Sequence, residues 1–526
     1  MNMLPPTNTD NNDMRNLIVA VILSALIFIG FEFYNARNQP AEFPVGTSEN
    51  VSTANPLAPE ALPIQPTIGT TAQAPVPQVA VAAQEVALTT STLHGKISSR
   101  GARLGSLHLP AFGPNGGVEW LVAEGEKPHY ADFGWLGNGV VVPAPDSIWQ
   151  VAETSNTTSS AAFVWNNGQG QTFTRTYTPT GAYTVEVVDT MANTAANAVG
   201  VQHYAQVIRG GGHLPKESSS WVHFFGPQGI SNNIMTEVSY ADLPTEPVMT
   251  EGQGGWWGIS SHYFLTALLP PVAENTTRRL TSTSLNNVQL TSAVVQRQPT
   301  IVAGGQSYSV SNTLYMGPKE MAALKAVGHD LDRAVDYGWF AVIAKPMHTA
   351  MVWLEKYLGN WGLAIIALTI VVKLIMLPLT HKSMVAMAKL KQLQPEMKAL
   401  QDKYKDSQAK ENMAVEMMSL YKKHKVSPVS GCWPVMLQMP VFFAMYKVML
   451  VSFEFRAAPF YGWITDLSAQ DPFYVLPVLM GVSMWVQMRQ SPSTGDPVQQ
   501  QVMQIMPVVM TVMFLFFPSG LVLYWL

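Results

Sequence analysis

A run of about twenty apolar residues constrains this chain more than any other feature. Residues 361–380, WGLAIIALTIVVKLIMLPLT, have about the 20 residues that an α-helix needs to cross a bilayer. The run carries one charged side chain, Lys373, which lies about 10 Å from Thr380 at a rise of roughly 1.5 Å per residue. We therefore expect a membrane span over residues 361–380 with a cation well inside its apolar part.

Two interpretations of Lys373 follow from this position. Thr369, Lys373, Met376 and Thr380 have the spacing of one helix face. An ionisable group at this depth costs roughly 2.5–3.5 kcal/mol on insertion scales and usually faces a bundle interior or a water-filled cavity. Alternatively, the lysine snorkels to the nearer interface, although its stem must then pass Pro378 and two helical turns. The first interpretation predicts a hydrated positive site within the membrane, and the second predicts none.

The composition indicates a membrane protein that also has a water-exposed part. Charged residues are 13% and hydrophobic residues 47% of the 526 positions, whereas an average soluble domain is about 25% charged. The net charge of −4 does not indicate nucleic-acid binding. We find no zinc spacing, P-loop or dinucleotide fingerprint, so we expect no DNA partner, no metal, no cofactor and no enzyme activity. The single cysteine, Cys432, excludes an internal disulfide and is expected to be a small buried hydrophobe.

The amino-terminal part of the chain, residues 1–85, is expected to contain a membrane anchor followed by a linker. Leu17 to Tyr34 is an apolar run in which only Glu32 is charged, and we expect residues 1–36 to form an uncleaved signal-anchor span. The alternative is a cleaved signal peptide, but the run is long for one and the small residue Ala36 makes a poor cleavage site. Residues 37–85 are rich in Pro, Ala, Thr and Gln, which predicts a disordered linker.

Residues 86–320 change to a period of two. Phe173 and Tyr177 fall on one side of a strand, and similar short alternating runs are separated by Gly, Pro and Asn turns. This pattern predicts an antiparallel β-sandwich domain outside the membrane. The pair Trp256 and Trp257 is expected in a core or interface, with a sugar-binding platform as the alternative.

Residues 321–360 lead into the span. Asp336 to Asn360 has a helical period, which favours an amphipathic helix in the headgroup plane over an ordinary packed helix. One face is expected to hold Trp339, Ile343, Met347, Met351, Leu354 and Leu358, with Lys345, His348, Glu355 and Lys356 away from it.

Residues 381–430 carry ten lysines against five acids, which places this segment in the cytoplasm by the positive-inside rule. Apolar residues at steps of three or four predict two antiparallel helices with a turn near Lys405. The seam is expected to contain Met384, Met387, Leu390, Leu393, Met397, Leu400, Tyr404, Met413, Met417, Leu420 and His424. The lysine face is either only solvated or meets lipid headgroups, ribosomal RNA or a targeting factor.

Residues 431–526 contain the remaining spans. Gln438 lies six residues from the cytoplasmic start of its span, at a depth close to that of Lys373, so the two could share a hydrated pocket. The last span is not completed within the given residues, and we expect the native protein to continue. The expected spans are Cys432–Val451, Phe473–Met488, Met503–Phe517 and Leu521–Leu526.

Several long stretches, in order along the chain, resemble the YidC-type membrane protein insertases of Gram-negative bacteria. The resemblance covers essentially the whole length. The stretches are RNLIVAVIL, SNTLYMGPKE, ALTIVVKLIMLPLT, LQP, EMMSLYKKHKV, GCWPVMLQMPVFFAMY, DLSAQDPFYVLPVLMG and FPSGLVLY.

The resemblance implies a polytopic α-helical membrane bundle of six spans, the last one truncated here, with a periplasmic all-β supersandwich and a cytoplasmic helical hairpin. It also implies a groove that is open to cytoplasm and lipid and closed outward. In this family a basic residue in the groove attracts the polar part of a client protein, whose apolar segment then enters lipid along the third and fifth spans. Lys373 stands where the family usually has arginine, and Thr369 and Trp525 fall at client-contacting positions.

The function implied is insertion and folding of integral membrane proteins in the bacterial inner membrane, alone or with the Sec translocon. Nascent membrane proteins and lipids are the expected partners, with the ribosome as a further partner of the basic hairpin. Two alternatives stay open. A transporter or channel for a small anion would use Lys373 and would be expected to show inverted repeats, which we do not find. A membrane-anchored periplasmic sugar-binding protein would need only its β domain.

Overall fold

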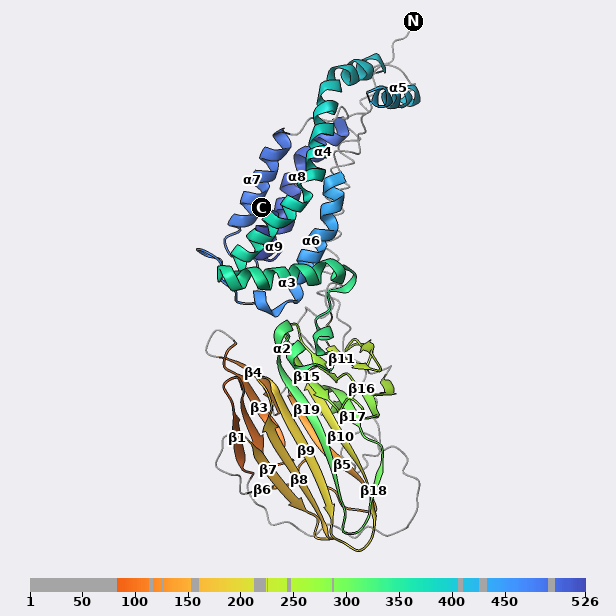
Figure 1. Cartoon of the computed structure of the whole chain (residues 1–526), viewed down its shortest axis with the longest axis vertical. Helices are drawn as coiled ribbons and strands as arrows, with labels where there is room; N and C mark the ends of the chain where they lie inside the picture. Colours follow the sequence, from red (N-terminus) through yellow and green to blue (C-terminus); the bar gives the residue numbers. More distant parts are fainter. Residues whose placement is uncertain are drawn as a thin grey trace, which may run out of the picture. The chain divides into compact units, whose positions relative to one another are not determined.

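The computed structural model divides into two compact units, which we describe separately (Figure 1). The β unit contains the described residues up to Gly338 together with Val451–Glu454, and the helical unit contains the other described residues. The expected anchor over residues 1–36, the linker up to residue 82 and Cys432 lie outside the described residues. The structure describes residues 83–112, 117–123, 127–152, 160–211, 224, 226–243, 247–285, 288–404, 410–424, 433–490 and 497–526.

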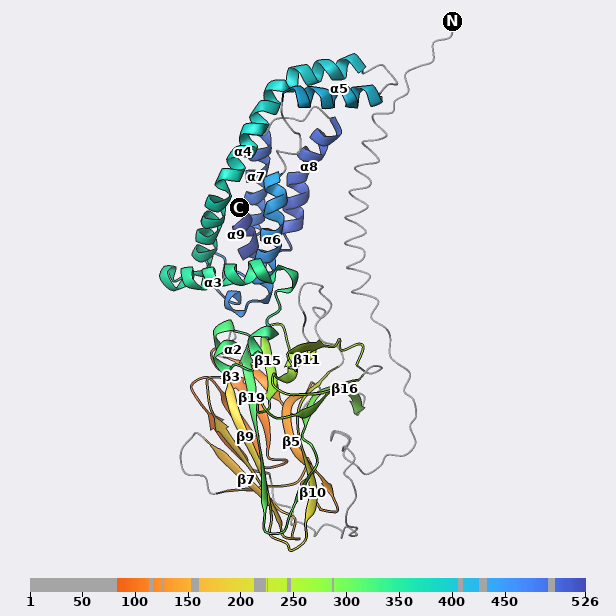
Figure 2. The ribbon, with the colours of Figure 1, turned by 45° about the vertical axis from the view of Figure 1, so that its right-hand side comes forward.

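The β unit consists of two antiparallel sheets, which confirms the predicted all-β sandwich (Figures 1 and 2). One sheet has the order β1-β2-β3-β4-β5-β10-β17-β16-β13, with β18 paired to β10, and the other has the order β12-β11-β14-β15-β19-β9-β8-β7-β6. The strands are β1 Glu85–Thr89, β2 His94–Ser98, β3 Arg103–Leu109, β4 Val118–Val122, β5 His129–Asn138, β6 Gln150–Val151, β7 Ala161–Asn166, β8 Gln171–Pro179, β9 Thr184–Asn193, β10 Val199–Gly210, β11 Gly226–Ser231, β12 Ile234–Glu237, β13 Val248–Gly252, β14 Trp257–Ser260, β15 Phe264–Leu269, β16 Thr276–Leu285, β17 Val288–Gln296, β18 Thr300–Val302 and β19 Ser307–Pro318.

The core of the β unit lies between the two sheets, where the alternating strand residues face one another. Phe173 and Tyr177 of β8 are fully buried, as their period of two predicts, and they pack with Phe133 of β5 from the other sheet. Trp256 and Trp257 are also fully buried, and their indole nitrogens donate hydrogen bonds to backbone carbonyls. These two tryptophans are therefore core residues and do not form an exposed sugar platform.

The β unit extends past the predicted boundary at residue 320. Helix α2, Met321–Val327, and the 3-10 helix η2, Leu331–Ala334, belong to it, and Leu324 and Leu331 are fully buried. The separate segment Val451–Glu454 belongs to it as well. Its Phe453 packs edge-on against two aromatic rings of the unit, with ring centroids 5.0 Å from Phe112 and 5.6 Å from Phe264.

The helical unit places its longest helix across two predicted segments. Helix α4 runs from Trp361 to Tyr404 without a break, so the expected span 361–380 and the first arm of the expected hairpin form one helix. Pro378 and Pro395 lie inside it, since a long helix can accommodate a proline by bending locally. The described helices of the unit are η3 Gly338–Phe340, α3 Ala341–Leu358, α4 Trp361–Tyr404, α5 Lys410–Lys423, α6 Trp433–Val451, η5 Phe453–Phe455, α7 Val475–Gln490, α8 Pro497–Phe514 and α9 Ser519–Trp525, of which η3 and η5 extend into the β unit.

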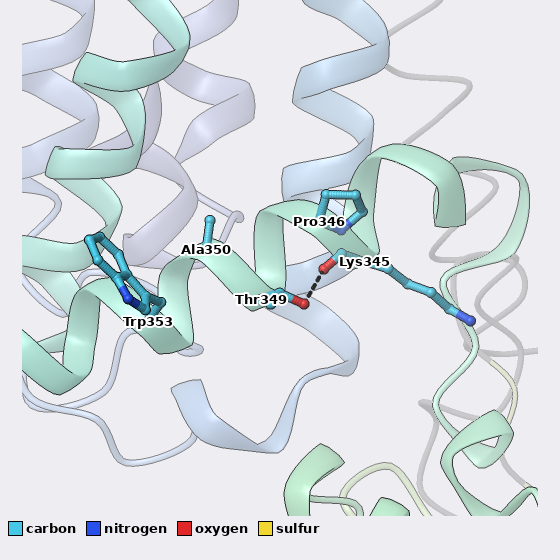
Figure 3. Close-up of a pocket in the computed structure, with 5 residues that line it drawn as sticks. All are labelled: Lys345, Pro346, Thr349, Ala350 and Trp353. Atoms are coloured by element: carbon cyan, nitrogen blue, oxygen red, sulfur yellow. Dashed lines mark hydrogen bonds between the residues drawn. The ribbon is translucent and has the colours of Figure 1, made fainter.

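Helix α3 is shorter than the predicted Asp336–Asn360 and buries a different face. Met347 and Met351 are buried as predicted, but Trp339 is 100% exposed and His348, expected on the polar side, is 4% exposed. The buried stripe is therefore Ala344, Met347, His348 and Met351. Figure 3 shows part of the opposite face, where Trp353 projects from the helix.

The two antiparallel helices predicted for residues 381–430 are present as the end of α4 and α5, which lie side by side in Figure 2. Their contacts pair residues in opposite order along the two chains. The contacts are Tyr404 Oη to Glu416 Oε1 at 2.7 Å, Lys403 Nζ to Glu416 Oε2 at 3.1 Å, and His424 Nε2 to Glu396 Oε2 at 3.6 Å. Leu393 and Met397 are buried in the predicted seam, whereas Met384 is 65% exposed and lies outside it.

Candidate functional site

The helical unit is tightly packed at one end, which we call the closed end. Its buried side chains come from the start of α4, the end of α6, the start of α7, the end of α8, α9, and the loop between α6 and α7. Asp471 in that loop organises the packing, since its carboxylate accepts hydrogen bonds from Trp463 Nε1 at 2.9 Å and from Leu476 N at 2.7 Å. The closed end contains the fully or nearly fully buried residues Ala364, Ile365, Leu368, Met445, Val448, Met449, Phe455, Ile464, Leu467, Leu476, Met480, Phe514, Leu521 and Val522.

The opposite ends of the same helices have almost no buried side chains, and we call this region the open end. It comprises residues 369–382 of α4, 436–441 of α6, 482–489 of α7 and 504–509 of α8. Pro507 is the one buried residue in these four segments. Helices α4 and α7 run toward this end, and α6 and α8 run away from it, so the four segments lie at the same end of the bundle. One end of the described bundle is therefore closed, and the other is not.

Lys373 lies in the open end, one turn beyond the last buried residue of the first part of α4. Its side chain is exposed, and within the described residues it makes no ion pair. The surrounding positions of the helix are apolar and exposed, with exposed fractions of 45% for Val371 and 61% for Leu374. Thr369, one turn earlier, is half-buried and donates its hydroxyl to the carbonyl of Ile365 at 2.8 Å. Lys373 is therefore the one charged side chain in the apolar part of α4, residues 361–380, and it has no ion-pair partner among the described residues.

Gln438 pairs with a residue that sequence reasoning did not select. Its Nε2 donates to Tyr524 Oη at 2.7 Å, and Tyr524 is 2% exposed. The two residues are 86 positions apart and connect α6 to α9 where the open end meets the closed end. A tyrosine within an apolar run needs a partner for its hydroxyl, and this requirement was the signal available in the sequence.

Trp525 is half-buried in an aromatic cluster beside this hydrogen bond. Its ring centroid lies 5.0 Å from Phe442 and 5.7 Å from Phe514. Gln438 and Trp525 therefore belong to one group of contacting side chains from α6, α8 and α9. Lys373 and Thr369 lie on α4, and no hydrogen bond connects them to Gln438 or Trp525 within the described residues.

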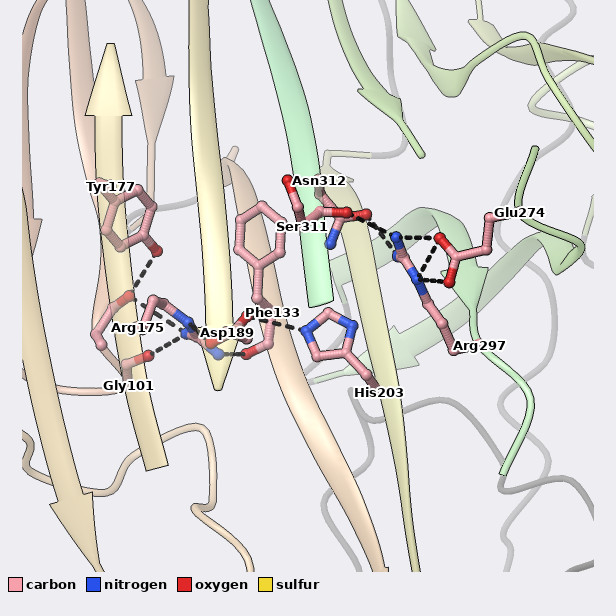
Figure 4. A network of polar contacts seen from close by, with 11 residues as sticks. Gly101, Phe133, Arg175, Tyr177, Asp189, His203, Glu274, Arg297, Ser311 and Asn312 are labelled. Carbon is pink, nitrogen blue, oxygen red and sulfur yellow. Dashed lines mark hydrogen bonds and ion pairs between the residues drawn. The ribbon is translucent and has the colours of Figure 1, made fainter. Parts of the chain in front are cut away.

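The β unit contains a second group of charges, and there each charge has partners. Arg175 of β8 lies between the sheets and donates to Asp189 Oδ1 at 2.7 Å and to the carbonyl of Phe133 at 2.6 Å (Figure 4). Asp189 Oδ2 in turn lies 2.9 Å from His203 Nε2. Burial opposes the ionised form of Asp189, but Arg175 and the hydrogen bond from His203 hold its pKa below the usual range. This cluster is enclosed and paired, which indicates a structural role.

No group of three or more metal-binding side chains occurs among the described residues. Of the described helices, α4 alone is both long and apolar enough to cross a membrane by length and composition. The shorter apolar helices cover Met436–Val451, Val475–Arg489 and Gln504–Phe514.

Comparisons with known proteins cover both units. Residues 85–350 match the family model described as YidC periplasmic domain, and residues 353–526 match the one described as 60Kd inner membrane protein. A membrane protein insertase YidC of Magnetococcus marinus is 36% identical over 546 residues, covering 97% of this chain and 96% of the relative. A membrane protein insertase YidC of Geobacter metallireducens is 36% identical over 534 residues, covering 97% of this chain and 95% of the relative.

A solved structure, described as an active YidC insertase with its first transmembrane domain resolved, is 18% identical and covers 85% of this chain and 90% of that chain. Its TM-score of 0.38 is too low to support an argument about fold. The two family models together match nearly all of residues 85–526, and two relatives are 36% identical over nearly the full length of both chains. This chain belongs to the YidC family.

Proposed function

We propose that this chain is a membrane protein insertase and chaperone of the bacterial inner membrane. The observation that carries the proposal is the exposed, unpaired Lys373 on the apolar part of α4, in the open end of a bundle whose other end is closed. Relatives that match over nearly the full length are named membrane protein insertases, and no name among them is that of an enzyme. The chain acts on nascent membrane proteins in contact with lipid.

The open end serves as a hydrated groove for the polar part of a client. A polypeptide tail buried without water leaves its polar groups unpaired at several kcal/mol each. A groove that admits water halfway across the bilayer shortens the dry distance, and Lys373 attracts acidic tails into it. Thr369, Gln438 and Trp525 line the path, and the closed end stops water from crossing.

The driving force comes from the client, because the sequence contains no nucleotide-binding motif. Its apolar segment partitions into lipid, and the membrane potential contributes roughly 2.3 kcal/mol per charge per 100 mV. Lysine keeps the positive charge of the family's usual arginine but lacks its planar fork of five donors. Lys373 therefore attracts a carboxylate without holding it in a fixed geometry.

The membrane arrangement follows from the same proposal. Six spans place the β unit in the periplasm and the basic helix pair formed by the end of α4 and α5 in the cytoplasm. There its lysines are available to the ribosome and to lipid headgroups. The chain works alone or beside the Sec translocon.

Two substitutions at Lys373 test the proposal. Lys373→Arg retains insertion, whereas Lys373→Glu reduces insertion of clients with acidic tails by about tenfold or more, since electrostatic attraction becomes repulsion. The measurement is protease protection of radiolabelled small membrane proteins in cells depleted of the native protein. Lys356→Glu, at an exposed lysine of α3 outside both the open end and the basic helix pair, is the matched control and leaves insertion unchanged. Photocrosslinking from position 373 to a nascent chain shows contact directly.

Equal insertion by the arginine, lysine and glutamate forms would mean that Lys373 only snorkels to the interface. Removing much of residues 90–320 separates the proposal from a sugar-binding role. Insertion continues without these residues if the helical unit does the work. Loss of the protein's function on that deletion, with the spans dispensable, would contradict an insertase.

A further inference from the structure

Helix α3 carries an open groove on the face opposite its buried stripe. The groove has a volume of about 660 Å³ and is lined by Lys345, Pro346, Thr349, Ala350 and Trp353. The groove is wide open to solvent, so it can contact only one side of a ligand lying along the helix. The lining is mainly apolar, and its one charged side chain is Lys345.

The polarity of the groove changes along the helix. Figure 3 shows Lys345 at one end and Trp353 at the other, with Pro346 and Ala350 between them and the ammonium group directed away from the indole. The eight steps from Lys345 to Trp353 along the helix span about 12 Å at roughly 1.5 Å per residue. Trp353 is 58% exposed, and its ring stacks at a tilt on Tyr357 with centroids 4.8 Å apart. Indole and phenol rings prefer the level of lipid headgroups.

The charge at the far end of the groove has no ion-pair partner in the part of the chain that the structure describes. The Thr349 hydroxyl donates to the backbone carbonyl of Lys345 at 2.9 Å, so it does not compete for the ammonium group. A ligand that fits both ends is an anion joined to a hydrocarbon chain.

We propose that this groove binds one phospholipid with an anionic headgroup, with its phosphate at Lys345 and an acyl chain along Pro346, Ala350 and Trp353. The inference rests on the proposed membrane function and on the headgroup-plane position expected for Asp336–Asn360, which contains α3, but it does not depend on insertion activity. A protein segment would need donors and acceptors to satisfy its own backbone. Among apolar walls, the groove supplies only the Lys345 ammonium group and the Thr349 hydroxyl, which already donates to the Lys345 carbonyl. A lipid chain has no such need.

The test measures lipid binding to the purified full chain in detergent by native mass spectrometry, with phosphatidylglycerol and phosphatidylcholine titrated separately. Lys345→Gln weakens phosphatidylglycerol binding about fivefold, since one cation near an anionic lipid contributes about 1 kcal/mol. Its phosphatidylcholine binding changes less than twofold. Lys356→Gln, which removes an exposed lysine of the same helix outside the groove, changes binding of both lipids less than twofold. Trp353→Ala weakens both lipids, because it removes an apolar wall.

Equal losses in the Lys345 and Lys356 variants would overturn the site, because they would reduce it to general surface charge. Equal affinity of the unaltered protein for the two lipids would overturn it as well, as would a protein-derived peptide that displaces both lipids at lower concentration. Inorganic phosphate that competes as strongly as the lipid would show that no acyl chain is held and would also count against the proposal. Lys373→Glu retains lipid binding while losing insertion, so failure here and failure of the proposed function give different results.

Discussion

Arg175 in the β unit and Lys373 in the helical unit are both cations among apolar side chains, yet their surroundings differ completely. Arg175 is 1% exposed and is held by the Asp189 carboxylate and by the carbonyls of Gly101, Ala102 and Phe133. Lys373 is exposed and has no ion-pair partner among the described residues. A charge whose partners are built into the fold stabilises that fold, whereas a charge without them is available to a ligand.

The substitution Asp189→Ala tests whether Arg175 depends on its partners, and it is expected to have the largest effect. Removing one partner of a buried ion pair leaves the other charge uncompensated, so we expect the β unit to lose about 3–5 kcal/mol of unfolding free energy. Urea unfolding of the full chain, followed by pulse proteolysis of the β unit, measures this. Lys96→Ala is the control, because its ion pair with Glu85 is 63% exposed on both sides, and it costs under about 1 kcal/mol. A small effect of Asp189→Ala would mean that Arg175 does not need its partner.

Asp471→Ala tests a partnered charge within the closed end of the helical unit. Asp471 is 1% exposed and accepts hydrogen bonds from Trp463 Nε1, Phe473 N and Leu476 N, so its removal leaves one buried donor, Leu476 N, and two partly buried donors unpaired. We expect a loss of about 2–3 kcal/mol, seen as earlier thermal unfolding in detergent. Ser468→Ala, in the same loop but half-buried, serves as the control and has a smaller effect. Equal effects would remove Asp471 as the organising residue.

The stability of the β unit at different pH values adds a third case to the comparison of Arg175 with Lys373. This case is a buried group, His129, that is kept neutral. Burial, with help from Arg209, lowers the pKa of His129 to about 3 from its ordinary 6.5, while the Trp120 carbonyl opposes this shift. The unfolded state then binds the proton more readily, so stability is complete above about pH 6.5 and falls as the pH drops toward about 3. We expect the β unit to lose about 2 kcal/mol between pH 7 and pH 5 from this group.

His129→Gln removes the loss of unfolding free energy that comes from His129. Urea unfolding of the β unit at several pH values measures this change. His94→Gln, at an exposed position of β2, leaves the slope as it is. An unchanged slope in His129→Gln would show that other groups carry the acid sensitivity.

Lys373→Met is expected to have the smallest effect on stability. Because Lys373 has no partner to lose among the described residues, its replacement changes the unfolding free energy by less than about 0.5 kcal/mol. Thermal unfolding of the purified chain checks this while the insertion assay reports a loss. A large loss of stability would place Lys373 in the same class as Arg175 and would contradict the comparison.

Much of the fold could be predicted because it depends on local patterns. The period of two around Phe173 and Tyr177 gave β8, and steps of three or four gave the helix pair that contains Met397. The helix does not end at Thr380, because α4 continues through Pro378 with no local signal for its end, and the membrane boundary expected at Thr380 stays a prediction. The face of α3 was also misjudged at His348, since which side of a helix is buried depends on the elements packed against it.

The sequence by itself determined that this chain has an apolar span with one internal lysine, an alternating β region and a basic helical segment. Each of these follows from side chains only a few positions apart. Tertiary structure alone decided which charges find partners. It brought Gln438 to Tyr524 and Arg175 to the carbonyls of β5, and it left one end of the helices unpacked around Lys373. Pairing and burial depend on contacts between residues far apart in the chain, and no local period encodes them.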